Sequence, residues 1–260
     1  MKVISLVENT TKLDCPVEHG LSLYIETEKH TILFDTGQGT LFRENAERFN
    51  VDLSKVDICV LSHGHYDHGG GLKEFTRVND TAKIYMNKNA FGFHYNAMDK
   101  YIGLEREWLS DEEFQARVVY VDGQMKLDDE LTIYGPGNKK VIDMGSAGLT
   151  MKEDGKLVPE DFRHEHYLEI FENGKRILIS GCSHQGIINI MSWFSPDVLI
   201  GGFHFMKQEL GETLAGYGKQ LNEFDADYYT CHCTGVEQFE FLRPYIKRMN
   251  YLSEGAVLEV

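Results

Sequence analysis

The sequence predicts an α/β fold, and three observations lead to this prediction. Apolar runs of strand length alternate with turns and helix-like segments in the first and last parts of the chain. The chain has 260 residues, of which 42% are hydrophobic, enough to bury one large core or two modest ones. Histidines stand directly after several of the predicted strands, where the functional groups of α/β sheets gather.

The first part of the chain predicts strands joined by tight turns. Residues 1–8 are an opening strand, with an apolar run too short for a signal peptide. Residues 21–25 and 31–34 are short β-rich runs around a polar turn, which predicts a hairpin. Residues 41–49 have helical spacing. Residues 56–61 are a nearly continuous apolar run, typical of a strand buried on both faces.

The last third of the chain again alternates predicted strands, turns and helices. Three strands are predicted there, and each is followed within about four residues by a histidine: 176–180 by His184, 197–202 by His204, and 227–230 by His232. Helices are predicted over 187–194 and from Val236 onwards. Three repetitions of one placement indicate a common site at the ends of these strands.

Residues 83–159 interrupt this alternation of strands and helices. They contain strand-like runs at 118–121 and 131–134 and a predicted helix around 110–117. They contribute a single histidine, His94, which we expect at the surface, as we do His30. We therefore expect this segment to be an insertion or elaboration, a small subdomain within the fold.

The charge and the cysteine content exclude several classes of protein. The 41 acidic residues outnumber the 26 basic ones, which gives a net charge of −15. This balance argues against a nucleic-acid partner and against docking on anionic membranes, since both need clustered basic residues. No apolar run reaches the ~18 residues of a membrane span. The odd number of cysteines, five, argues against a disulfide framework and for a reducing, cytoplasmic location.

The strongest functional signal is the motif His63-x-His65-x-Asp67-His68, which follows the predicted strand at 56–61. Two imidazoles two residues apart can converge on one cation, and the Asp–His pair can face a second. Zinc binds neutral imidazole nitrogens, and catalytic zinc sites keep one position for water. A histidine-rich surface loop is the alternative interpretation, but this pattern after a buried strand favours a metal site.

The motif resembles the signature of the metallo-β-lactamase superfamily. The resemblance implies an αββα four-layer sandwich, two β-sheets with helices outside and a metal site at one edge. It covers most of the chain, which implies one domain over residues 1–260 with the 83–159 segment inside it. Five segments are similar to the branch of dihydropterin-methyl-aminobenzene-phosphate synthases of methanopterin biosynthesis, which also holds metal-dependent hydrolases: Glu18–Ser22, Leu33–Gly37, Gly181–Ile187, Gly201–His204 and His232–Gly235.

The resemblance implies two divalent metal ions, zinc first, with manganese or iron as alternatives. By position, the first ion would be held by His63, His65 and His184, and the second by Asp67, His68 and His232. His164 and His166 are the alternative to His184, from the slot that hydrolase relatives use, but their spacing fits that slot poorly. In much of the superfamily an acidic residue after a glycine bridges the metals, and here the pair reads Gly181-Cys182. Cys182 is either a thiolate ligand or a buried packing residue.

The resemblance also implies roles beside ligation. Asp35 corresponds to an aspartate that braces the ligand loop. Asp67 would hold or accept the proton of the attacking water. His204 stands where phosphodiesterase relatives place a histidine that assists proton transfer or binds phosphate. His19 would line the pocket.

The sequence thus predicts a metal-dependent enzyme acting on a small anionic or phosphorylated substrate. Hydrolysis of an ester and a pterin-type transfer, in which an aromatic ring attacks a methylene and displaces pyrophosphate, both remain open. The alternative is a non-catalytic metal-binding or ligand-sensing module on the same fold. A redox di-iron member is disfavoured because the chain has no appended flavin or electron-transfer domain. The oligomeric state stays open.

Overall fold

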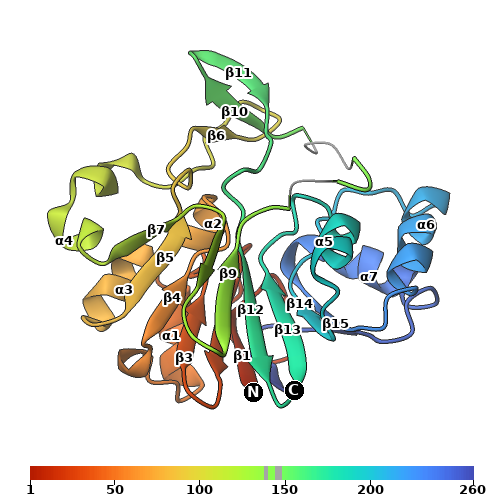
Figure 1. The fold of residues 1–260 in the computed structure, drawn as a ribbon, viewed down its shortest axis with the longest axis horizontal. Coiled ribbons are helices and arrows are strands. Elements are labelled where there is room, and N and C mark those ends of the chain that lie inside the picture. Colours follow the sequence, from red (N-terminus) through yellow and green to blue (C-terminus); the bar gives the residue numbers. More distant parts are fainter. Residues whose placement is uncertain (138–139, 144–147) are drawn as a thin grey trace.

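The computed structural model describes residues 1–137, 140–143 and 148–260. Within these residues two seven-stranded sheets pack face to face, with helices on both outer faces (Figure 1). The first sheet has the order β17-β1-β2-β3-β4-β5-β7, with β1 (Lys2–Val7), β2 (Ser22–Glu26), β3 (Thr31–Phe34), β4 (Ile58–Val60), β5 (Lys83–Asn87), β7 (Val118–Val121) and β17 (Val257–Glu259). The second has the order β16-β15-β14-β13-β12-β9-β8, with β8 (Gln124–Lys126), β9 (Leu131–Tyr134), β12 (Tyr167–Glu172), β13 (Lys175–Ser180), β14 (Val198–Ile200), β15 (Asp227–Thr230) and β16 (Met249–Tyr251).

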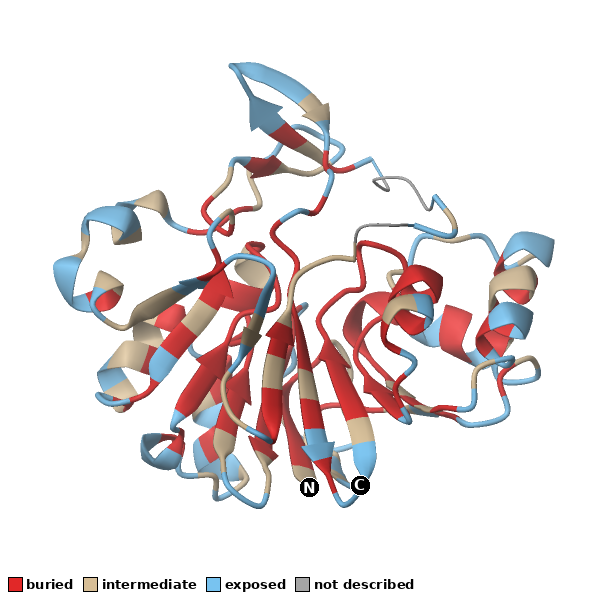
Figure 2. Ribbon diagram, viewed as in Figure 1, coloured by how far each residue is buried: buried red, intermediate tan, exposed pale blue. Residues whose placement is uncertain are grey.

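Each sheet carries its own layer of helices. The first is covered by α1 (Leu41–Arg48), α2 (Tyr66–Gly69), α3 (Leu72–Val78) and α4 (Glu112–Gln115), and the second by α5 (Ile187–Phe194), α6 (Glu212–Leu221) and α7 (Val236–Leu242). Buried hydrophobic residues form three clusters, one between the sheets and one under each helix layer. Figure 2 shows the buried residues in red along the strands of both sheets. This confirms the α/β class and the αββα sandwich.

Side-chain alternation along the strands builds these layers. In β12, Leu168 and Ile170 face the first sheet, while Tyr167 packs under α5. Burying each such aliphatic side chain contributes about 1.5–3 kcal/mol. The short apolar β4 is buried throughout, as predicted. None of the helices in the described part of the chain is long and apolar enough to span a membrane.

The segment 83–159 contributes to all three sheets. Strands β5 and β7 belong to the first main sheet, and β8 and β9 to the second. The separate small sheet consists of β6 (His94–Tyr95), β10 (Thr150–Glu153) and β11 (Lys156–Pro159), and it projects beyond one end of the sandwich (Figure 1). Residues 138–139 and 144–147 of the expected insertion lie outside the described residues.

The expectation that His94 is a surface residue is wrong. Its side chain is only 3% exposed because its ring stacks on that of His164, with ring centroids 4.0 Å apart. Glu160 also contacts it, with Oε2 2.7 Å from His94 Nδ1. The contacting residues are far away in the sequence, so a local pattern could not reveal the burial.

His30 is partly exposed and links the two sheets. Its Nδ1 lies 2.7 Å from Asp57 Oδ2 beside the first sheet, and its Nε2 lies 2.8 Å from Asp128 Oδ2 in the β8–β9 turn of the second. Burial lowers the pKa of His30, but the hydrogen bonds to Asp128 and Asp57 outweigh it, and the pKa is raised.

This link should make stability depend on pH. Because the folded-state pKa of His30 is raised, the contribution is complete below the ordinary pKa of ~6.5 and is lost as the pH rises through the raised value. We expect His30→Gln to lower the free energy of unfolding by up to about 1 kcal/mol at about pH 5.5 and by less at about pH 9. Urea unfolding of both proteins at both pH values measures this. An equal loss at both would contradict an ionic role for His30.

Candidate metal centre

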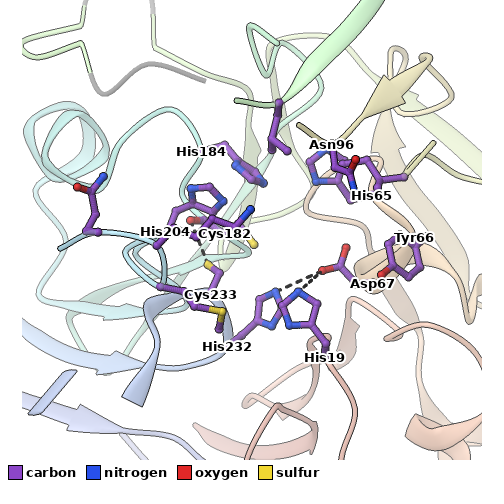
Figure 3. A pocket seen from close by; sticks show the side chains of 15 residues that line it. His19, His65, Tyr66, Asp67, Asn96, Cys182, His184, His204, His232 and Cys233 are labelled. Carbon is purple, nitrogen blue, oxygen red and sulfur yellow. Dashed lines mark hydrogen bonds and ion pairs between the residues drawn. The ribbon is translucent and has the colours of Figure 1, made fainter. Parts of the chain in front are cut away.

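A pocket lies at the end of the sandwich where the small sheet projects, and it is lined by His65, Asp67, His184, His204 and His232. His63 and His68 are buried and do not line it. The cavity has a volume of about 230 Å³, somewhat below the ~300–1,000 Å³ of typical small-molecule sites. Figure 3 shows His184, His204 and Cys182 on one side of it and His65, Tyr66 and Asp67 on the other. Leu149 and Asn96, from the segments around the small sheet, also line it.

The loop after β4 places the first set of ligands. His63 and His65 follow the strand in extended or turning backbone, and α2 then begins at Tyr66, which puts Asp67 and His68 in its first turn. Ser62 Oγ lies 2.8 Å from His63 Nδ1. The other nitrogen of that ring, Nε2, is buried and has no hydrogen-bond partner among the described residues.

Three strand ends of the second sheet place the other set. β13 is followed by Cys182 and His184, β14 by His204, and β15 by His232. His204 and His232 have left-handed backbone, with φ of 57° and 47°. Non-glycine residues rarely adopt this conformation, and it concentrates at functional sites.

Gly181 allows this second set to approach the first. A Cβ atom at this position would lie 2.2 Å from Ser62 Oγ and 3.2 Å from His63 Nδ1. Only glycine therefore lets the turn after β13 pack against the loop after β4, which brings Cys182 beside the histidine motif.

The ligand atoms form two groups that share Cys182. His63, Cys182 and His184 make one, and His68, Cys182 and His232 make the other, with all ligand atoms of each group within 4.8 Å of one another. His68 Nε2 lies 3.2 Å from both Cys182 Sγ and His232 Nε2. Asp67 Oδ2 adjoins the second group, 3.6 Å from His232 Nε2.

His184 lies closer to the motif than His164 does. The ring centroids of His63 and His65 are 4.8 and 5.0 Å from that of His184, but 5.9 and 5.3 Å from that of His164. His65, expected to share an ion with His63 and His184, is in neither of the groups that contain Cys182. Its ligand atom lies instead with those of His94, Glu160 and His164. His166 lies apart, with its Nε2 3.1 Å from Asn87 Nδ2.

Buried acceptors orient the ligands from behind. Asp35 accepts hydrogen bonds from the Ser62 amide and hydroxyl, both at 2.7 Å, and its Oδ2 lies 2.7 Å from His68 Nδ1. His232 Nδ1 is likewise 2.8 Å from Asn9 Oδ1. Such partners fix the ring tautomer that leaves Nε2 free for a metal. Asp35 thus occupies the bracing position expected from the sequence.

The electrostatics favour neutral rings at three of the histidines but not at His68. Burial lowers the pKa of His68, yet Asp35 and Asp67 outweigh it and the pKa is raised. Burial lowers the pKa of His63, His65 and His184 well below the usual range, so their nitrogens keep free lone pairs. At Asp67, burial raises the pKa, but the neighbouring His68 and His19 outweigh it and the pKa is lowered. Burial, and next Cys233, raises the pKa of the Cys182 thiol.

The residues fit a pair of divalent ions. His63 Nε2, His65 Nε2 and both nitrogens of His184 are buried without a hydrogen-bond partner among the described residues, an arrangement that native proteins avoid unless something else binds there. Imidazole, thiolate and carboxylate together are a donor set suited to zinc.

Sequence reasoning missed several residues of this site. Lys207, an exposed cation at the pocket, lies close to His204. Glu165 accepts hydrogen bonds from the His184 and Gln185 amides at 2.7 and 3.0 Å and so holds the loop that carries His184. The position of Glu165 between two histidines could have indicated its role from the sequence, whereas no local pattern marks Lys207. His19, expected to line the pocket, lies with its Nε2 3.3 Å from Asp67 Oδ2.

Comparisons with known proteins agree with this architecture. The uncharacterized protein MJ0448 of Methanocaldococcus jannaschii is 34% identical over 247 residues, covering 89% of this chain and 90% of its own. The 7,8-dihydropterin-6-methyl-4-(beta-D-ribofuranosyl)-aminobenzene-5'-phosphate synthase of the same organism is 26% identical over 286 aligned residues, covering 100% and 96%.

A solved structure gives the same fold. Tm1679, described as a metal-dependent hydrolase of the beta-lactamase superfamily, superimposes with a TM-score of 0.85 at 24% identity, covering 100% of this chain and 99% of its own. The sequence model of the Metallo-beta-lactamase superfamily matches residues 15–215. The chain therefore belongs to the metallo-β-lactamase superfamily.

Proposed function

We propose that this protein is an enzyme that uses two divalent ions, zinc first, to act on a small phosphorylated or anionic molecule. The observation that supports it best is that two groups of buried ligand atoms share Cys182, which itself lines the pocket. Cys182 occupies the position at which many superfamily members have an acidic residue that bridges the metals, so its thiolate could bind both ions. Lys207 at the same pocket supplies a positive charge for an anionic group.

The side chains around the ions would position the substrate and move protons. When bound, two divalent ions activate a nucleophile and stabilise a leaving oxygen. Asp67 stays ionised because its pKa is lowered, so its Oδ2, with His19 and His232 at 3.3 and 3.6 Å, can accept a hydrogen bond from the attacking water and orient it. Burial, and next Lys207, lowers the pKa of His204 to about 4. His204 is therefore neutral, and its ring N–H can donate to the leaving oxygen or to a phosphate oxygen of the substrate.

Hydrolysis of a phosphoester is the reaction that we propose first, because the superfamily consists mainly of metal-dependent hydrolases. The pterin-type transfer is the second candidate, supported by the similarity to the synthase over the whole chain. In the hydrolysis, water attacks phosphorus and an alcohol oxygen leaves, whereas in the transfer an aromatic ring attacks the methylene carbon and pyrophosphate leaves. Both substrates carry a phosphate group that the same site can hold.

One set of incubations distinguishes these reactions. Zinc-loaded protein is incubated with a phosphodiester and, separately, with a dihydropterin pyrophosphate plus an arylamine, and His63→Ala is the control. Release of phosphomonoester identifies the hydrolase, and a coupled aryl product with free pyrophosphate identifies the transferase. Bound metal without turnover of either substrate would instead favour the non-catalytic metal-binding or ligand-sensing module.

Replacing Cys182 tests whether the two ions share a ligand. We expect Cys182→Ala to weaken zinc binding by more than the ~10–100-fold that loss of an outer partner costs, because both groups lose a ligand. Cys182→Asp should restore binding, since a carboxylate at this slot serves many relatives. Zinc titration of the three proteins measures this. Wild-type affinity in Cys182→Ala would make the thiol a packing residue.

A further inference from the structure

A second cluster of possible metal ligands lies away from the pocket, at the other end of the sandwich. It consists of His30, Asp128 and Glu130, and one ligand atom of each lies within 4.8 Å of the others. His30 directly precedes β3, whereas Asp35 of the metal centre follows the opposite end of that strand. Asp128 and Glu130 belong to the turn between β8 and β9 of the second sheet. None of these three residues is part of the centre described above.

The carboxylate of Glu130 is the clearest indication that an ion binds here. The residue is only 5% exposed, and neither of its side-chain oxygens has a hydrogen-bond partner among the described residues. Native proteins rarely leave buried polar atoms without a partner, and a buried carboxylate needs a compensating positive charge. The lysines beside this turn, Lys126 and Lys29, hold the pKa of the exposed Asp129 below its ordinary value instead.

His30 has the hydrogen-bond partner that a metal-binding histidine needs. Its Nδ1 lies 2.7 Å from Asp57 Oδ2, and its Nε2 lies 2.8 Å from Asp128 Oδ2. A histidine ligand usually donates one ring N–H to a carboxylate and binds the metal through its other nitrogen. Donation from Nδ1 to Asp57 leaves Nε2, beside Asp128, for an ion.

A protonated His30 accounts for this cluster only in part. Its single positive charge lies among the carboxylates of Asp57, Asp128 and Glu130. Glu130 receives no hydrogen bond from it. A divalent ion beside a neutral ring brings two positive charges and can contact Glu130 directly. The protonated link between the sheets described above is therefore the metal-free form of the cluster.

We propose that His30, Asp128 and Glu130 bind a divalent metal ion in addition to the two-ion centre. One imidazole and two carboxylates suit zinc or manganese. The ion would fasten the turn between β2 and β3 of the first sheet to the turn between β8 and β9 of the second. It would stabilise the packing of the two sheets and take no part in the reaction at the pocket.

The test counts the zinc that binds to variants prepared side by side. Each protein is dialysed against rising concentrations of free zinc, and the bound zinc per chain is measured by elemental analysis. The wild type should saturate with one equivalent more than Glu130→Gln, which keeps the volume of the side chain, and one more than His30→Gln. Asp129→Asn is the matched control, because it removes an acid of the same turn outside the cluster. It should bind as much zinc as the wild type.

Asp57→Asn distinguishes a ligand from the residue behind it. It should keep this equivalent but bind it roughly 10–100-fold more weakly, the effect of losing an outer partner. Equal saturation of the wild type, Glu130→Gln and His30→Gln would overturn the proposal and leave the cluster as an ion pair of His30. Circular dichroism confirms that each variant is folded.

His63→Ala separates this proposal from the proposed function. It should lose zinc from the two-ion centre and lose turnover, yet zinc should still raise the urea concentration at which half of it unfolds. A further Glu130→Gln replacement in the same chain should abolish that rise, and a rise that persists would contradict a stabilising ion at this cluster. In the otherwise wild-type chain, Glu130→Gln should keep full turnover.

Discussion

His184→Ala is expected to remove an ion of the two-ion centre and to reduce turnover to background. Both nitrogens of this buried ring lack a hydrogen-bond partner among the described residues, and the ring contacts those of His63 and His65. The loss of zinc affinity should exceed the ~10–100-fold caused by losing an outer partner. The fold should survive, because the turn that carries His184 is held by the amide hydrogen bonds to Glu165.

His164→Ala is the matched comparison for this prediction. Both rings are buried near His63, and His164 is the alternative third ligand that the sequence offered. Metal content and turnover are measured on the same preparations. Turnover that disappears in His164→Ala and persists in His184→Ala would reverse the assignment of the first ion.

His204→Ala is expected to slow turnover by roughly 10²–10⁴-fold, the range of a general acid–base group, while both ions stay bound. His204 lies beside His184, with ring centroids 4.3 Å apart, yet it belongs to neither ligand group that shares Cys182. Its left-handed backbone turns the side chain into the pocket.

Zinc content and kcat of His204→Ala are measured together. Loss of one zinc equivalent would make His204 a ligand, and an unchanged kcat would assign it a structural role. His204→Gln provides a comparison, because it keeps polar contacts to a phosphate but cannot carry a proton. A rate near that of the wild type in His204→Gln would identify phosphate binding as the role.

Local patterns predicted much of the fold and of the centre. Apolar runs in the sequence predicted five elements with the same bounds as in the structure: β3, β7, β9, β15 and α5. The predicted strand ends also placed His184, His204 and His232 in one site, because the carboxyl ends of parallel strands meet at one edge of a sheet. The helix α6 has no clear helical pattern, since Gly216 and Gly218 weaken it.

Contacts between residues far apart in the sequence could not be predicted from local patterns. The partner of His94 is Glu160, 66 residues further on, and no local period connects them. The role of Cys182 likewise depends on the close approach of two loops that Gly181 permits. The sequence offered two interpretations of this thiol, and the geometry gives a specific reason to test the ligand role.

The division of the centre between two sheets affects the order of folding. His63 and His68 follow a strand of the first sheet, whereas Cys182, His184 and His232 follow strands of the second. On a ribosome, the histidine motif emerges long before the strands that complete its coordination. A metal ion can bind with full affinity only after the halves have docked, so its binding energy is gained late in folding. Interactions formed that late slow unfolding more than they speed folding, and bound metal should therefore prolong the lifetime of the native state.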